Sequence, residues 1–343
     1  MSAPARAARY TASMKYRPLG RTGVQVSQLC MGTMSFGGDA DAATSAALYK
    51  ACRDAGINFF DTADVYSKGR AEEILGGLIK GHRDQLVLTT KCFGPMGEGV
   101  NDRGTSRRHV TRAVEASLKR LQTDRVDVLF LHQYDALTPI EEQMRALEDL
   151  VRAGKILYPA VSNYAAWQTQ KALDVQQHNG WARLQVIQPM YNLVKRQSEV
   201  EILPMAEANG LGVIPYSPAA GGLLSGKYTG AGTDSPAGRL ATNKMYEVRY
   251  GEAWVHEVAT RFADFCRARG LHPVSAAVAW VAAHPAVTAP IIGGRNVEQL
   301  TASLDAVKLD MTPALRAELA ALSRTPPPAT DRLEEAKKEE IKS

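Results

Sequence analysis

Three apolar runs in the first half of the chain each end on an ionisable side chain. These side chains are Asp61, Lys91 and His132, and Tyr66 follows Asp61 five positions later. An ammonium close to a phenol favours the phenolate and lowers the pKa of the phenol, while a carboxylate beside the ammonium holds it in place. A histidine opposite the phenol can orient a carbonyl oxygen, so the four groups would form a general acid aimed at a carbonyl. No Ser-His-Asp order or activated cysteine offers a nucleophile, and we therefore expect an external hydride donor.

Each of the four residues also has an ordinary structural interpretation. Asp61 could close its strand with an Asx-turn, which would leave Tyr66 as a surface aromatic in a loop. Lys91 could be a solvated strand end, and His132 could be a hydrogen-bonded core residue. Taken one at a time, the structural interpretation is preferred. Four such residues on three successive strands favour a shared site.

The elements that must position these residues are short β-branched runs that alternate with segments of helical period. Apolar stripes mark helices over residues 107–122 and 253–270, and eight strands are expected at residues 26–33, 57–62, 85–91, 126–132, 157–163, 184–191, 212–217 and 287–293. This alternation predicts a (β/α)8 TIM barrel as a single domain. A doubly wound dinucleotide-binding sheet is disfavoured, because no GxGxxG follows the first strand. In a barrel the carboxyl ends of the strands share one face, where active sites are built.

Segments outside the strands and helices complete the predicted organisation. Residues 218–251, after the seventh strand, are rich in Gly, Ser and Thr, and we expect a long mobile loop there. Residues 1–13 lack the apolar segment of a secretory signal and are expected to be a disordered arm, with Met14 as an alternative start. The barrel is expected to span residues 14–325, followed by a charged, frayed tail over 326–343.

Composition excludes several classes of function. The chain of 343 residues carries a net charge of only +5, and no Lys/Arg cluster alternates with aromatics, so nucleic acid is not an expected partner. No apolar run reaches the ~18 residues that a membrane helix needs, and residues 274–287 are expected to form a buried helix. Four scattered cysteines without a CxxC pair predict reduced thiols in a cytoplasmic protein and no metal site. The oligomeric state is left open.

Several segments, in order along almost the whole chain, resemble the aldo-keto reductase superfamily, and most closely its bacterial and plant branch related to potassium-channel β subunits. They include "GINFFDTADVYSKGRAEEILG", "LVLTTKC", "IQPMYNLVKR", "GLGVIPYSPAAGGLLSGKY" and "PIIGGRNVEQL". The resemblance implies a (β/α)8 barrel with the catalytic tetrad Asp61, Tyr66, Lys91 and His132. It also implies reversible NADPH-dependent reduction of aldehydes or ketones, with hydride from nicotinamide C4 and the proton from Tyr66. The alternative is an NADP(H)-binding regulatory or redox-sensing subunit with slow turnover. A barrel metallohydrolase is a third possibility, but it lacks further ligands at the strand ends.

The same resemblance implies a set of cofactor contacts. Tyr216 would stack on the nicotinamide, and its carboxamide would bind Ser162, Asn163 and Gln188. The pyrophosphate would lie against Ser217, Pro218, Gly222 and Lys227. A Walker A loop is rejected, because Tyr228 stands where that loop needs Ser or Thr. The adenosine 2′-phosphate would meet Arg295, with Gln299 nearby, which favours NADPH over NADH; alternatively, Arg295 could cap its own helix. The remaining expected contacts are Gly32, Thr33, Met34, Asp61, Ala219, Gly293 and Ser303.

Two positions depart from the family pattern. The residues expected to line the substrate pocket come from the predicted loops. Relatives commonly carry Leu at the position of Ala219 and Asn at that of Ser303, where the side chain meets the adenine. The substrate is expected to be a small carbonyl compound in a pocket walled by Met34, residues 93–100, Tyr134 and residues 218–251.

Overall fold

The computed structural model describes residues 14–228 and 244–330. Its centre is an eight-stranded parallel sheet in the order β10-β3-β4-β5-β6-β7-β8-β9. Its strands are β3 (Cys30–Gly32), β4 (Phe59–Asp61), β5 (Val87–Cys92), β6 (Val126–Leu131), β7 (Ile156–Ser162), β8 (Val186–Gln188), β9 (Gly212–Val213) and β10 (Ile291–Ile292). Backbone hydrogen bonds from Thr288 and Ile291 to the carbonyls of Val213 and Pro215 join the two edges of the sheet and close it. The predicted (β/α)8 barrel is confirmed.

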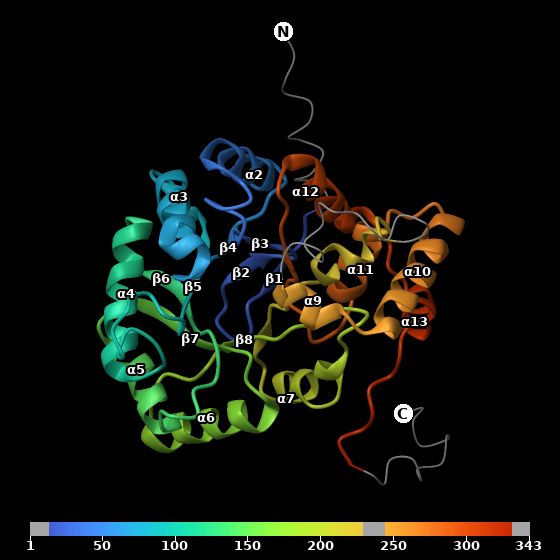
Figure 1. Cartoon of the computed structure of the whole chain (residues 1–343). Helices are drawn as coiled ribbons and strands as arrows, with labels where there is room; N and C mark the ends of the chain where they lie inside the picture. The colour runs from blue at the N-terminus through green and yellow to red at the C-terminus, as the bar shows by residue number, and fades with distance from the viewer. Residues whose placement is uncertain (1–13, 229–243, 331–343) are drawn as a thin grey trace.

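Helices surround the strands in an outer ring (Figure 1). They are α2 (Ala42–Asp54), α3 (Arg70–Ile79), α4 (Arg107–Leu121), α5 (Ile140–Arg152), α6 (Ala166–Asn179), α7 (Ile202–Ala208), α9 (Lys244–Tyr250), α10 (Ala253–Ala268), α11 (Pro273–Ala282), α12 (Val297–Leu304) and α13 (Pro313–Ala321). The apolar stripe predicted for residues 107–122 is buried in α4, whose N-cap Ser106 accepts from the His109 amide. The predicted buried helix is α11, which carries no charged residue. Among the described helices, none has the length and apolar character that would let it cross a bilayer.

The barrel interior is packed by apolar side chains that come from most of the strands. Phe59, Val87, Phe130 and Val186 belong to this cluster, and two residues from outside the barrel strands, Leu19 and Val26, close it at one end. A larger cluster fills the space between the strands and the outer helices. Such a layered interior leaves no channel through the barrel, so a ligand of the barrel strands would lie at their ends and not in the centre of the barrel.

The first predicted strand, 26–33, is wrong in extent. Residues Gln25–Ser27 form β2, which pairs antiparallel with β1 (Tyr16–Pro18) in a separate hairpin, and only Cys30–Gly32 enters the barrel. The chain turns between the two pieces, where the Ser27 hydroxyl donates to the carbonyl of Leu29 at 2.7 Å. The sequence of residues 26–33 did not show that the chain passes there from the hairpin to the barrel sheet.

The predicted long loop after the seventh barrel strand also holds regular structure. A short 3₁₀ segment, η4 (Ala220–Ser225), and helix α9 lie within residues 218–251. Tyr246 and Tyr250 of α9 are buried, so the helix is stabilised by tertiary packing rather than by its own sequence pattern. The middle of this loop, the arm 1–13 and residues 331–343 of the predicted tail lie outside the described residues.

Candidate active site

The period-2 alternation that fills the barrel continues into polar residues at the carboxyl ends of the strands. In β4, the inward-facing Phe59 is followed two residues later by Asp61, and in β5 Val87 is followed at the same spacing by Thr89 and Lys91. The same register relates Phe130 to His132, Ala160 to Ser162, Val186 to Gln188, and Ile214 to Tyr216. The polar rim is therefore the upper layer of the same stack of inward-facing side chains.

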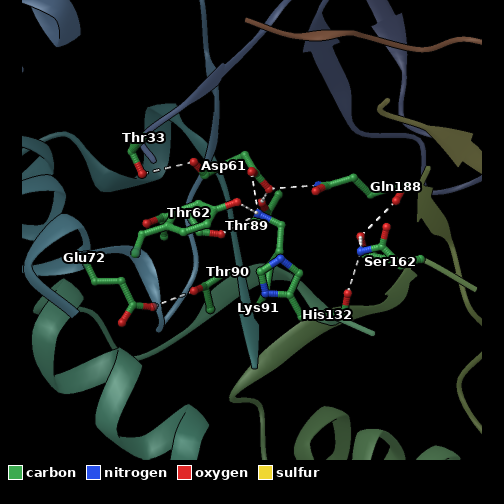
Figure 2. Close-up of polar contacts among 12 residues, drawn as sticks. Thr33, Asp61, Thr62, Glu72, Thr89, Thr90, Lys91, His132, Ser162 and Gln188 are labelled. Atoms are coloured by element: carbon green, nitrogen blue, oxygen red, sulfur yellow. Dashed lines mark hydrogen bonds and ion pairs between the residues drawn. The ribbon is translucent and has the colours of Figure 1, made fainter. Parts of the chain in front are cut away.

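Lys91 is the centre of this rim. Its side chain is fully buried, and its Nζ donates to Asp61 Oδ2 at 2.5 Å and to the Thr62 carbonyl at 2.7 Å (Figure 2). The same Nζ also donates to Tyr66 Oη at 3.3 Å. Burial lowers the pKa of Lys91, but the Asp61 carboxylate and the Tyr66 hydroxyl outweigh it and raise that pKa above its ordinary value. Lys91 therefore stays charged inside the barrel.

Asp61 is held in place by neighbours other than the lysine. Its Oδ1 accepts from Thr89 Oγ1 at 2.6 Å and from Gln188 Nε2 at 3.1 Å. The Asp61 backbone carbonyl accepts from the Thr33 hydroxyl at 3.2 Å. Both carboxylate oxygens thus have donors, as a buried carboxylate requires. The sequence had indicated no role for Thr89, although its inward register two residues before Lys91 was the available signal.

Tyr66 begins the 3₁₀ turn η1 (Tyr66–Gly69), in which Ser67 and Lys68 adopt left-handed backbone angles with φ of 48° and 54°. The ring is partly exposed, whereas its hydroxyl lies against the buried Lys91 ammonium. Burial raises the pKa of Tyr66 by more than the charge of Lys91 lowers it. The expectation of a net lowering is therefore wrong for the protein alone, because the hydroxyl is removed from water.

His132 faces the tyrosine across the rim. The two rings lie edge to face with their centroids 6.1 Å apart. Burial, helped by the charge of Lys91, lowers the pKa of His132 to about 3. The imidazole is consequently neutral near pH 7 and can donate one N–H to an oxygen placed between the rings.

The residues expected at the nicotinamide carboxamide also converge on this rim. Asn163 donates from Nδ2 to the His132 carbonyl at 2.9 Å and accepts at Oδ1 from the Tyr216 hydroxyl at 2.7 Å. Ser162 donates to the Gln188 carbonyl at 2.9 Å. The side-chain nitrogen of Gln188 donates to Asp61, and the other polar atom of the Gln188 side chain is its oxygen.

A second group of expected cofactor residues lies along the loops that follow β9 and β10. Ser217 adopts a left-handed φ of 58°, Pro218 follows it, and the turn through Ala219 to Gly222 includes positive φ values at Gly221 and Gly222. Lys227 Nζ lies 4.9 Å from the centroid of the Tyr228 ring.

The loop after β10 carries the expected 2′-phosphate residues. Gly293 precedes Arg295, whose backbone amide is bound by Gln299 Oε1 at 3.2 Å and whose Nε lies 3.3 Å from Asp39 Oδ2. Ser303 is buried in α12. On the adjacent strand, Gly32 ends β3 and Met34 is 40% exposed. Nothing in the sequence pattern indicated Asp39, because its partner is 256 positions away.

Metal chemistry finds no support in the part of the chain that is described. There, no three His, Cys, Asp or Glu side chains form a group that could hold a metal ion. Cys30, Cys52, Cys92 and Cys266 are buried and free. The polar rim is instead built around one buried ammonium.

Comparison with known proteins places the chain among oxidoreductases. The family model described as "Aldo/keto reductase family" matches residues 28–324. The chain is 40% identical to "Uncharacterized oxidoreductase YrpG" of Bacillus subtilis (strain 168), over 87% of this chain and 92% of that protein. It is 37% identical to "Probable voltage-gated potassium channel subunit beta" of Oryza sativa subsp. japonica, over 89% and 94%. It is 32% identical to "Versiconal hemiacetal acetate reductase" of Aspergillus parasiticus, over 88% and 94%.

Proposed function

The chain belongs to the aldo/keto reductase family and is an NAD(P)H-dependent oxidoreductase, and on this premise we propose that it reversibly reduces aldehydes or ketones to alcohols with NADPH. The observation that carries the proposal is the placement of the Lys91 ammonium between Asp61 Oδ2 and Tyr66 Oη at the carboxyl rim of the barrel. Burial raises the pKa of Tyr66, but the Lys91 cation opposes that rise and stabilises the phenolate that would remain after the proton is given up.

The donor set at the rim fits a dinucleotide. The turn at Gly221 and Gly222 has positive φ at both glycines, and a Cβ at Gly222 would lie 3.5 Å from Lys227 Nζ. Such a turn beside a lysine suits a pyrophosphate. Arg295 on the neighbouring loop suits a second anionic group. Tyr216, Asn163 and Ser162 would then hold the nicotinamide end, next to the tetrad.

The four residues of the tetrad have different roles in orienting the carbonyl group and supplying the proton. The reduced nicotinamide, when bound, supplies a hydride to the carbonyl carbon. Neutral His132 orients the carbonyl oxygen through its N–H, and Tyr66 gives its proton to that oxygen as negative charge develops. Lys91 stabilises the resulting phenolate, and Asp61 keeps Lys91 charged and fixed. Asp61, Lys91 and Tyr66 are hydrogen-bonded to one another before a substrate arrives, so little reorganisation of these three groups opposes the reaction.

The direct test is consumption of NADPH by the purified protein with a panel of aldehydes, ketones and aldoses. We expect loss of the reduced-nicotinamide absorbance that depends on the carbonyl compound, with repeated turnover. The second candidate function, an NADP(H)-binding regulatory or redox-sensing subunit, is favoured by the likeness to the rice protein named as a channel β subunit. It would give tight cofactor binding and no more than a single slow turnover with every compound of the panel.

Preference for NADPH is proposed to depend on Arg295, whose guanidinium can bind a phosphate bidentately. Arg295→Ala should raise the KM for NADPH by about 10-fold or more while changing the KM for NADH by less than about 2-fold. Equal effects on the two cofactors would show that Arg295 does not contact the 2′-phosphate.

We also propose a cytoplasmic location, which the four free cysteine thiols support.

A further inference from the structure

Two loops from adjacent strands meet at the edge of the rim. The loop after β3 and the loop after β10 are joined by a hydrogen bond from Ser35 Oγ to the Gly294 carbonyl at 2.9 Å. Next to this bond, the Asp39 carboxylate lies 3.3 Å from Nε of Arg295. Both side chains keep contact with solvent, at 48% exposed for Asp39 and 30% for Arg295. An acid and a base from distant parts of the sequence therefore share one position at the mouth of the site.

The backbone that carries Asp39 is a tight turn, so the position of its Cα is fixed relative to the strand it follows. The amide of Gly37 donates to the Ala40 carbonyl at 2.8 Å, and the amide of Ala40 donates to the Ser35 carbonyl at 2.9 Å. Immediately afterwards, Asp41 caps helix α2 by accepting from the Thr44 amide at 2.8 Å. These contacts fix the backbone on both sides of Asp39, whose carboxylate lies 3.3 Å from Arg295 Nε.

The two groups favour different substituents at the 2′ position of a ribose. A carboxylate accepts a hydrogen bond from a 2′-hydroxyl, whereas an arginine accommodates a 2′-phosphate. A carboxylate beside the same guanidinium offsets the positive potential around it and repels a phosphate that approaches it. An exposed ion pair of this kind is weak, so it can exchange partners when an anion binds.

We propose that Asp39 is a specificity-determining residue that weakens the preference for NADPH and favours NADH, by holding a carboxylate on the arginine that would bind the 2′-phosphate. The inference rests on the proposed function, because that function assigns the 2′ position to Arg295. The preference of this chain for NADPH over NADH should therefore be weaker than Arg295 alone would produce. The relevant probes are NADPH and NADH themselves.

The test is equilibrium binding of each dinucleotide by calorimetry to four proteins: wild type, Asp39→Asn, Arg295→Ala and Asp124→Asn. Asp124 is a matched control, because it is an exposed aspartate 3.2 Å from an arginine, Arg125, and precedes β6 at the opposite end of the barrel. Asp39→Asn should tighten NADPH binding about fivefold relative to NADH, and Asp124→Asn should leave the ratio unchanged. Thermal melting of each variant checks that the fold is kept.

The possible results separate the inference from the proposed function. If Asp39→Asn leaves the NADPH-to-NADH ratio within twofold of wild type while Arg295→Ala shifts it, the inference is overturned and the role of Arg295 stands. Equal shifts in Asp39→Asn and Asp124→Asn would overturn the inference as well, because they would reflect net charge alone. If Arg295→Ala leaves the ratio unchanged, the assignment of Arg295 fails and the inference fails with it. No binding of either dinucleotide to the wild type would contradict the proposed function itself.

Discussion

Removing one oxygen atom, the hydroxyl of Tyr66, separates the chemistry of the site from its architecture. In Tyr66→Phe the ring keeps its shape, and Lys91 loses only its longest contact, at 3.3 Å. The two shorter contacts, to Asp61 at 2.5 Å and to the Thr62 carbonyl at 2.7 Å, remain. The free energy of unfolding should therefore fall by about 1 kcal/mol or less. The affinity for NADPH should be nearly unchanged.

The effect on the rate should be much larger, because no neighbour can replace Tyr66 in the proton-donating role that we propose for it. His132 has a pKa of about 3, so its imidazole is neutral near pH 7 and is a very poor acid. Lys91 is held by Asp61, and its raised pKa makes it reluctant to give up a proton. Loss of a general acid lowers a rate by about 100- to 10,000-fold, which corresponds to about 3 to 5 kcal/mol in the activation free energy.

The assay is single-turnover oxidation of bound NADPH by an aldehyde, accompanied by calorimetric binding of NADPH and by chemical denaturation. Tyr16→Phe is a matched control, because it also removes one tyrosine hydroxyl that makes a single hydrogen bond, to the Gly56 carbonyl at 2.8 Å, and Tyr16 lies in the β1–β2 hairpin outside the barrel sheet. A Tyr66→Phe protein that keeps its cofactor affinity and reacts within 10-fold of the wild-type rate would refute the assignment of Tyr66 as proton donor.

Three further predictions follow from the burial of charges around the rim. Asp61→Asn leaves Lys91 buried without its anion and should lower the free energy of unfolding by about 3 to 5 kcal/mol in denaturant titrations; a loss below about 1 kcal/mol would contradict the importance of this pair. Because the pKa of His132 is about 3, an NMR titration should show its ring neutral down to pH 5, and a protonated ring at pH 6 would disprove this. Burial, followed by the charge of Glu72, raises the pKa of Asp64 from 3.8 to about 7. The neutral form of Asp64 therefore contributes stability that is present below pH 4 and is lost as the pH rises through 7. Asp64→Asn should therefore stabilise the protein at pH 8 by up to about 4 kcal/mol and should make no difference near pH 4, as measured by thermal melting; a stabilisation that does not change with pH would contradict this reasoning.

The sequence by itself was sufficient to predict the barrel and the position of its polar rim. Parallel strands that are buried on both faces are recognisable as apolar runs, and their regular alternation with helices predicts the closed sheet. Within each strand the period of two is rigid, so Asp61, Lys91 and His132 had to follow the inward-facing Phe59, Val87 and Phe130. Local hydrophobicity could not reveal where residues 26–33 change from the hairpin to the barrel, or that α9 forms in the long loop, since both depend on packing against distant residues.

What only the tertiary structure decided is the electrostatic state of the site and its long-range pairing. The direction of the pKa shift of Tyr66 depends on how far burial outweighs the charge of Lys91, and removal from water is a property of the whole fold. The attachment of the Gln188 amide to Asp61 joins residues 127 positions apart. The approach of Asp39 to Arg295 joins the first barrel strand to the last, because the sheet closes on itself. A linear pattern carries no record of such contacts, because they arise only when the strands take their places around the barrel.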